Sequence, residues 1–466
     1  MALSIGAGAA LIFWPGVAMY DSVSQFDQVL SAAYDDWHPP IMARLWAMLH
    51  GLCGGGTAPM LVLQLVLYAV GFGLIASTLA AIGRWRAAVA VLLLAASPLL
   101  LGWQVIVLKD GQMLGATVAG VGIVAAFRLR ERAMPTSAIL LVAVLLGYAT
   151  LVRTNAVFAI VPLALLLVRR PESVPWKLAL MMVAILLVLA ATPLINHRLL
   201  GAGSTDIAKS QPLFDLAGIT VRTPPEVRAA GFTSEERAAI IARHCAKAFF
   251  WDPLGDDRAC GAVTARLRSE PTVVLYRLLA KAVLAHPAAY VAHRFAHWSA
   301  TERWLVPPGL PSAAPTASSE PNDLGLISPP RPLAAEWDGW AGAEAATPLG
   351  WPIVWTFVAL IAGSVAYKRR ETPAGRLALA LAGSAVGLEA SFLFISIASD
   401  LRYHLWPMTA SALALILLAD GTPVRRAPLA IASAILSAIV VAGLYTRATL
   451  PAAPSSYRAM IAAPTG

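Results

Sequence analysis

The stretch TAPMLVLQLVLYAVGFGLIASTLAAIG, residues 57–83, is predominantly apolar and contains no charged side chain. A helix needs about 20 apolar residues to cross a hydrocarbon core of about 30 Å, so this stretch is long enough to span a membrane. The whole chain of 466 residues shares its character, because it is 58% hydrophobic and 13% charged, with a mean hydropathy of +0.69. These values are far from those of a soluble domain and predict an all-α, polytopic membrane protein.

Similar apolar stretches recur along the chain and predict about eleven transmembrane helices. The first begins at residue 2 and has neither the basic start nor the small-residue cleavage site of a signal peptide, so we interpret it as a retained helix. We expect spans at residues 2–20, 57–83, 87–106, 113–127, 137–152, 156–168, 178–195, 351–367, 377–399, 404–419 and 427–446.

The net charge of +9 reports membrane topology and gives no reason to expect a nucleic-acid partner. Fourteen basic residues fall in alternate loops, and four lie in the short loops between them. The positive-inside rule places the first set in the cytoplasm. The first set comprises Arg84, Arg86, Arg128, Arg130, Arg132, Arg169, Arg170, Lys177, Lys368, Arg369, Arg370, Arg376, Arg425 and Arg426, and the second Arg44, Lys109, Arg153 and Arg402.

This topology divides the chain into four parts. Residues 1–195 form a transmembrane catalytic module with a cytoplasmic amino terminus and an acidic first external loop, 21–56. Residues 196–350 form a large, helical external region, in which 305–350, rich in Pro, Ser, Ala and Gly, are expected to be irregular. Residues 351–447 contain the last membrane helices, and 448–466 an external tail. The apolar spacing of 22–34 predicts a helix lying on the outer surface.

Two of the three cysteines, Cys245 and Cys260, lie 15 residues apart in the external region. An outward-facing, oxidising location favours a disulfide between them over a metal site, because no second cysteine pair accompanies them. Two histidines, His293 and His297, have the spacing of a helical zinc pair, but no third ligand is near in sequence and packing roles are favoured.

The first external loop gathers acidic residues at the membrane surface. Asp21 follows the first span, and the run Asp35-Asp36-Trp37-His38-Pro39-Pro40 ends the loop's first half. A carboxylate held there suits an enzyme that removes a proton from an acceptor while its other substrate stays anchored in lipid. The alternative roles are a helix cap for Asp21, a solvated turn for Asp35 and Asp36, and a helix start at His38.

Among the basic residues predicted to lie on the outer side of the membrane, Arg153 is the strongest candidate for binding a phosphate. The predicted helices 137–152 and 156–168 are too short for two full spans, so Arg153-Thr154-Asn155 is expected below the outer surface or in a water-filled cavity. Its guanidinium can grip two phosphate oxygens, although snorkelling to the interface is an alternative. Lys109 and Arg402-Tyr403-His404 lie on the same face, where Asp110 and Asp400 are expected as salt-bridge partners.

The short first helix, the Asp after it, the His-Pro-Pro and the run Ser399-Asp400-Leu401-Arg402-Tyr403-His404 resemble the multispanning GT-C glycosyltransferases. The resemblance is closest to the branch with protein O-mannosyltransferases and the bacterial aminoarabinose and galacturonosyl transferases. One departure is Ser22, since many relatives have Asp-Glu where this chain has Asp21-Ser22.

The resemblance implies transfer of a sugar from a polyprenyl-phosphate donor to an envelope glycan, lipid or protein at the outer face of the bacterial cytoplasmic (inner) membrane, with the large loop periplasmic. Asp21 would be the general base, and Asp35, Asp36 and His38 would bind acceptor or sugar. Lys109, Arg153, Asn155, Arg402, Tyr403 and His404 would bind the donor phosphate. No cofactor is indicated with certainty, and a divalent metal is left open.

Glu389 is the one charge expected deep within a span, which keeps a second class of function open. A secondary transporter or lipid flippase could use it as an ion-coupled carboxylate, although no paired repeats or matched broken helices support that class. A lipid-linked polysaccharide polymerase or ligase is a third alternative, but it would not require the acids of the first loop.

Overall fold

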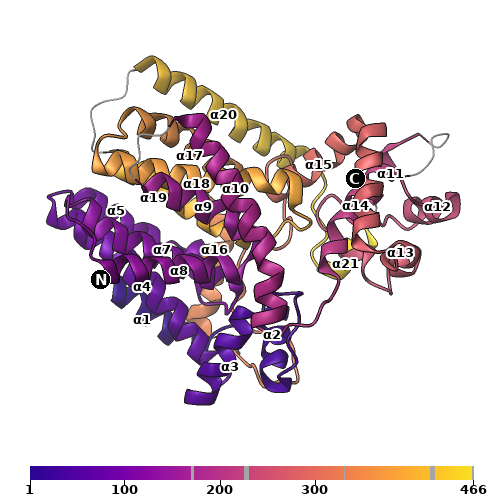
Figure 1. Ribbon diagram of the computed structural model, residues 1–466, viewed down its shortest axis with the longest axis horizontal. Helices are drawn as coiled ribbons and strands as arrows, with labels where there is room; N and C mark the ends of the chain where they lie inside the picture. The colour runs from indigo at the N-terminus through magenta and orange to yellow at the C-terminus, as the bar shows by residue number, and fades with distance from the viewer. Residues whose placement is uncertain (169–172, 225–229, 330, 420–425, 464–466) are drawn as a thin grey trace.

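The computed structural model describes residues 1–168, 173–224, 230–329, 331–419 and 426–463 (Figure 1). Within these ranges the chain is helical, and β-structure is limited to three isolated bridges. The protein is therefore an all-α membrane protein, as the sequence predicts. Of the basic residues assigned to cytoplasmic loops, Arg169, Arg170 and Arg425 lie outside the described residues.

The first part of the chain supplies ten helices, most of them strongly apolar. They are α1 (Ala2–Phe13), α2 (Tyr20–Ser31), α3 (Ile41–Cys53), α4 (Ala58–Ala81), α5 (Trp85–Ala95), α6 (Pro98–Gln104), α7 (Lys109–Arg128), α8 (Thr136–Val152), α9 (Val157–Leu167) and α10 (Val174–Pro193). A 3₁₀ turn, η1 (Thr154–Ala156), joins α8 to α9, and a π-helical turn, η2 (Leu194–Leu199), extends α10.

The rest of the chain forms residues 196–350, which are predicted to be external and are still called the external region, and the last membrane helices. The external region contains α11 (Ser210–Arg222), α12 (Ser234–Ala242), α13 (Gly261–Arg268), α14 (Thr272–Ala285), α15 (Pro287–Thr301) and α16 (Pro332–Ala346). It is followed by α17 (Pro352–Lys368), α18 (Pro373–Ile395), the 3₁₀ turn η6 (Leu401–His404), α19 (Leu405–Ala419), α20 (Arg426–Thr449) and α21 (Tyr457–Ala462). Figure 1 shows α11 to α15 gathered at one side of the molecule, away from α4, α5 and α7.

Six helices in the described residues are long and apolar enough to cross a membrane, or eight if two bent pairs each count as one span. Each of the eleven predicted spans coincides with a helix, but the count of eleven is not confirmed. The helices α1, α8, α9 and α17 have at most 17 residues, which cover about 26 Å at 1.5 Å per residue, less than the core of about 30 Å. The predicted span 87–106 is broken into α5 and α6, which meet at 55°.

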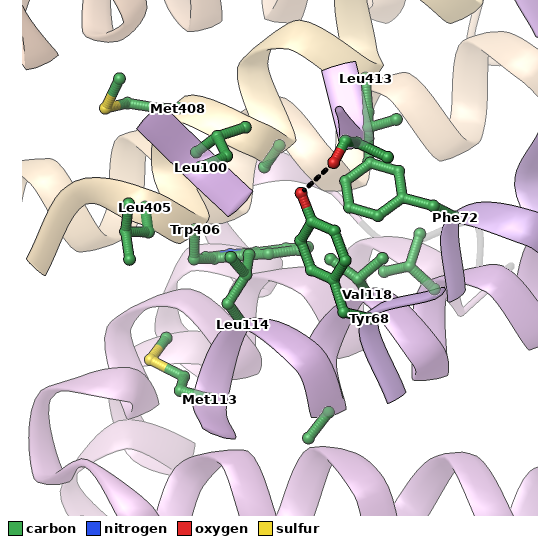
Figure 2. Packing of buried hydrophobic residues seen from close by; sticks show 14 of the residues in the cluster. Tyr68, Phe72, Leu100, Met113, Leu114, Val118, Leu405, Trp406, Met408 and Leu413 are labelled. Carbon is green, nitrogen blue, oxygen red and sulfur yellow. Dashed lines mark hydrogen bonds between the residues drawn. The ribbon is translucent and has the colours of Figure 1, made fainter. Parts of the chain in front are cut away.

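The membrane core is built by close packing of α4 against α7, and of α19 against α17 and α18. Figure 2 shows Tyr68 and Phe72 of α4 beside Leu114 and Trp406, with the Tyr68 hydroxyl donating to the carbonyl oxygen of Ala95 at 3.0 Å. At Gly71 the backbones of α4 and α7 touch, since a Cβ there would lie 2.5 Å from the Val118 carbonyl carbon. Glycine thus allows the close approach that fixes the position of α7.

The external region has its own small core, which is cross-linked by the predicted disulfide between Cys245 and Cys260. A capping box opens α12, where Thr233 and Glu236 each accept a backbone N–H of the other. At His286-Pro287 the chain bends by 109° between α14 and α15.

One expectation for this region is wrong, because residues 305–350 are not irregular throughout. They contain α16, which packs along α6. The Glu344 carboxylate accepts from the Ser97 hydroxyl at 2.7 Å and from the Leu99 N–H at 3.0 Å, so it caps the amino end of α6. This contact between α16 and α6, which are far apart in sequence, stabilises a helix where the composition alone predicts a loop.

Candidate functional site

Asp21 is positioned by the segment that enters α2. Val17 pairs with the chain just before α7, donating to Val105 O at 3.2 Å and accepting from the Val107 N–H at 2.9 Å. The buried Ser22 hydroxyl then donates to Val107 O at 2.6 Å. Lys109 begins α7 two residues later, so these bonds bring the start of α2 beside the start of α7. Met19 is the N-cap of α2, and Asp21 lies in its first turn, so the capping alternative is not found.

The Asp21 carboxylate faces three cationic or basic side chains from distant parts of the chain. Its Oδ2 lies 3.1 Å from Arg402 Nη2 and 3.6 Å from Lys109 Nζ, and its Oδ1 lies 3.8 Å from His38 Nε2. The Asp21 side chain is only 14% exposed. We call Asp21, His38, Lys109, Asp110, Arg153, Asp400, Arg402 and Tyr403 the charged cluster.

Arg402 lies at the centre of this cluster because η6 turns it inward ahead of α19. Its Nη2 also contacts Asp400 Oδ2 at 3.0 Å, and its Nε lies 3.9 Å from Asp110 Oδ2. The side chain is 8% exposed, and its Nη1 has no hydrogen-bond acceptor in the described part of the chain. A buried guanidinium N–H without an acceptor is energetically unfavourable and marks a place where an anionic oxygen would be stabilised.

Arg153 enters the cluster from the break between α8 and η1. It forms an ion pair with Asp110, and its Nε donates to Asn155 Oδ1 at 2.9 Å. Its guanidinium lies 4.3 Å from the centre of the Tyr403 ring, a cation–π contact. Asn155 therefore orients Arg153, and the snorkelling alternative is not found, because Arg153 is only 11% exposed.

The tautomer of His38 follows from its neighbour. Lys109 Nζ lies 2.6 Å from His38 Nδ1, and an ammonium group has only donors, so Nδ1 accepts and the ring proton sits on Nε2, which faces Asp21. Burial, and then the positive charge of Lys109, lower the pKa of His38 to about 3. The ring is therefore neutral near pH 7.

The carboxyl group of Asp21 stays ionised in this environment. Burial on its own would raise its pKa, but the charges of Arg402 and Lys109 outweigh burial and hold the pKa of Asp21 well below its usual range. With His38 neutral, the cluster contains three carboxylates (Asp21, Asp110 and Asp400) and three cations (Lys109, Arg153 and Arg402), so its formal charges cancel.

The other two acids of the first loop make local contacts. Asp36 accepts from the Thr205 N–H at 2.6 Å and its hydroxyl at 2.7 Å, and lies 3.4 Å from His197 Nε2. Asp35 accepts from the Trp37 N–H at 3.0 Å. Their described partners tie the loop to the end of α10 and do not include the charged cluster.

His404 points away from its neighbours in η6. Its Nδ1 lies 2.7 Å from Glu389 Oε2, and its ring packs against Phe392 with centroids 4.7 Å apart. Glu389 also interacts with Glu302, whose carboxylate accepts from the Thr356 hydroxyl at 3.2 Å. All three titratable side chains are buried. Sequence reasoning missed Glu302, since no local pattern marks a partner 87 positions from Glu389.

Each candidate zinc residue has a protein partner on one ring nitrogen. His293 Nε2 lies 3.1 Å from Asp215 Oδ1, and His297 Nδ1 lies 2.6 Å from Ala248 O. Among the residues that the structure describes, no group of three or more His, Cys, Asp or Glu side chains has a metal-binding arrangement.

Comparison with known proteins gives one distant structural likeness. No protein-family model matches the chain, and no curated protein matches its sequence. A solved structure that it resembles is the archaeal oligosaccharyltransferase AglB from Archaeoglobus fulgidus, in complex with an inhibitory peptide and a dolichol-phosphate. The match has 14% identity and a TM-score of 0.35 and covers 96% of this chain and 55% of that one, so this chain spans about half of its length. A TM-score this low establishes neither a shared fold nor a shared activity.

Proposed function

We propose that this protein is an integral-membrane glycosyltransferase of the GT-C type. It transfers a sugar from a polyprenyl-phosphate donor to a glycan, lipid or protein acceptor at the outer face of the cytoplasmic membrane. The observation that supports this proposal is the contact of one ionised carboxylate, Asp21, with Arg402 and Lys109 in a buried cluster. Transfer from a lipid phosphate requires both a proton acceptor and cations for the leaving group.

In the proposed reaction, the Asp21 carboxylate takes the proton of the acceptor hydroxyl as its oxygen attacks the anomeric carbon. The bond from that carbon to the phosphate oxygen breaks, and its electron pair leaves with the polyprenyl phosphate. The guanidinium groups of Arg402 and Arg153 and the ammonium of Lys109 stabilise the charge of the departing phosphate. His38 is assigned to the acceptor or sugar side, because its Nε2–H faces Asp21, the proposed base.

Because its pKa is depressed, Asp21 is a weak base in the free protein. The proposed reaction therefore requires that donor binding raise the pKa of Asp21. Phosphate oxygens compete with Asp21 for Arg402 and Lys109, whose charges depress its pKa in the free protein. Binding of the donor therefore makes Asp21 a better base at the moment when one is required. The acceptor is activated only after the donor is in place, which limits reaction before both substrates are bound.

The proposal is tested in a strain that lacks the chain, complemented with wild type, Arg402→Gln or Arg198→Gln. Arg198 is an exposed arginine in η2 and outside the cluster, so its variant is the matched control. Mass spectrometry of envelope glycans, lipids and glycoproteins should show one product short of a sugar in the deletion and Arg402→Gln strains, with accumulation of its polyprenyl-phosphate sugar. Unchanged profiles in the deletion strain contradict the proposal.

The transporter alternative rests on Glu389, whose described contacts are with buried side chains of the same protein. Its carboxylate is engaged by His404 and Glu302 between α15, α18 and η6. Loss of product with Glu389→Gln but not with Asp21→Asn would favour transport over transfer.

A further inference from the structure

A second set of charged side chains surrounds a cavity of about 250 Å³ where α7 and α9 end and α18 begins. Three arginines and two glutamates line it, together with apolar groups such as Leu377. The charged residues are Arg128, Glu131, Arg132, Glu371 and Arg376. None of them belongs to the charged cluster around Asp21.

The cavity lies at the opposite end of the membrane bundle from Asp21. The 20 residues of α7 run from Lys109 in the charged cluster to Arg128 in this cavity. At 1.5 Å per residue that length is about 30 Å, which matches the thickness of the hydrocarbon core. The cavity is therefore at the level of the lipid headgroups of the other leaflet.

The charges around this cavity are not neutralised by one another. Among the described residues, no ion pair within 4.0 Å joins Arg128, Arg132 or Arg376 to Glu131 or Glu371. Within the described ranges, the Arg376 guanidinium donates to the backbone oxygen of Glu371, at 3.4 Å. The nearest cation to the Glu371 carboxylate is Arg370, at 3.9 Å, which does not line the cavity.

We propose that this cavity binds a lipid headgroup that contains both a phosphate and a primary amine, such as phosphoethanolamine. Guanidinium groups bind phosphate oxygens in bidentate fashion, and carboxylates accept hydrogen bonds from an ammonium group. A purely anionic headgroup would meet two carboxylates, and a quaternary amine has no N–H to donate to them. Basic pockets between membrane helices are known sites for lipid headgroups.

This inference is independent of the proposed transferase activity. The simpler explanation is that these arginines only reflect the positive-inside rule. Under that explanation, replacing any arginine of the same loop would change lipid binding equally, and replacing the glutamates would not change it. Arg130 supplies the comparison, because it is exposed in the same turn but does not line the cavity.

The test is native mass spectrometry of the full-length protein with an equimolar mixture of phosphatidylethanolamine, phosphatidylglycerol and phosphatidylcholine of the same acyl chains. We expect preferential retention of phosphatidylethanolamine, reduced about tenfold by Arg128→Gln with Arg132→Gln and unchanged by Arg130→Gln. Glu131→Gln with Glu371→Gln should abolish the preference over phosphatidylcholine while retention persists. Thermal unfolding of each variant verifies that it is folded.

Three outcomes of the lipid-mixture experiment would overturn the proposal. These are equal retention of the three lipids, preferential retention of phosphatidylglycerol, and an effect of Arg130→Gln equal to that of the double arginine variant. A separate arm uses soluble O-phosphoethanolamine and inorganic phosphate as competitors. Displacement of the lipid by inorganic phosphate at micromolar concentration would assign the cavity to a free anion and overturn the lipid assignment.

Discussion

Replacing Asp21 by Asn, with Asp400→Asn as the control, separates a catalytic carboxylate from one that only balances charge. Both carboxylates contact the same atom, Arg402 Nη2, at 3.1 and 3.0 Å. At an effective dielectric constant of about 20, each contact contributes about 5 kcal/mol of attraction before desolvation is subtracted. The loss of charge beside Arg402 is therefore nearly the same in the two variants, and it cancels when they are compared.

What remains is the contact with Lys109 at 3.6 Å, which Asp21 makes and Asp400 does not, and the general-base contribution, which is typically 10²- to 10⁴-fold, or about 3–5 kcal/mol of activation free energy. We expect Asp21→Asn to lower the transfer rate at least about 100-fold more than Asp400→Asn. The assay follows the product identified by profiling, in membranes that contain equal amounts of each variant. Equal losses in the two variants, or retention of more than about a tenth of the activity by Asp21→Asn, would refute the assignment of Asp21 as the base.

Three further predictions follow from the same structure. The pKa of His38 is lowered to about 3 from 6.5, so below pH 6.5 the unfolded chain binds a proton that the folded chain does not. The free energy of unfolding should therefore fall by about 2 kcal/mol between pH 6.5 and 5. The variant His38→Asn should remove this pH dependence in thermal unfolding. Cys245→Ala with Cys260→Ala should destabilise the external region by about 3 kcal/mol, detected as faster hydrogen exchange there and not in α4. Glu389→Gln should keep transfer within about fivefold of wild type, because glutamine can still bond to His404 Nδ1; complete loss would show that its proton is required.

The helices could be predicted from the sequence because a lipid-length apolar run has few alternatives to a helix. The number of helices that cross the membrane could not be predicted. The helices α8 and α17 each have only 17 residues, and their depth in the membrane depends on the helices that pack against them. The bend between α5 and α6 had a local signal in Ser97-Pro98, where Ser97 caps α6. Apolar composition outweighed that signal when residues 87–106 were assigned to a single span.

Part of the candidate site could likewise be predicted from the sequence, and part could not. Charged residues are rare in the short loops that the sequence predicts to be external, so Asp21, Lys109, Arg153 and Arg402 could be grouped from their positions alone. The contacts of Asp36 and His404 could not be predicted, because their partners, Thr205 and Glu389, are fixed only by tertiary packing. Nothing in the sequence near either residue distinguishes a side chain that enters the cluster from one that leaves it.

The position of Arg402 has a consequence for biosynthesis. A ribosome makes Asp21 early and Arg402 only after all but the last three helices of the described chain, so the carboxylate emerges long before its strongest counter-ion. During most of translation the nascent chain must keep Asp21 and Lys109 hydrated, or shielded by the insertion machinery. Truncation ahead of η6 would leave an inserted but unfinished protein, and quality-control proteases would be expected to recognise it by this exposed polar surface.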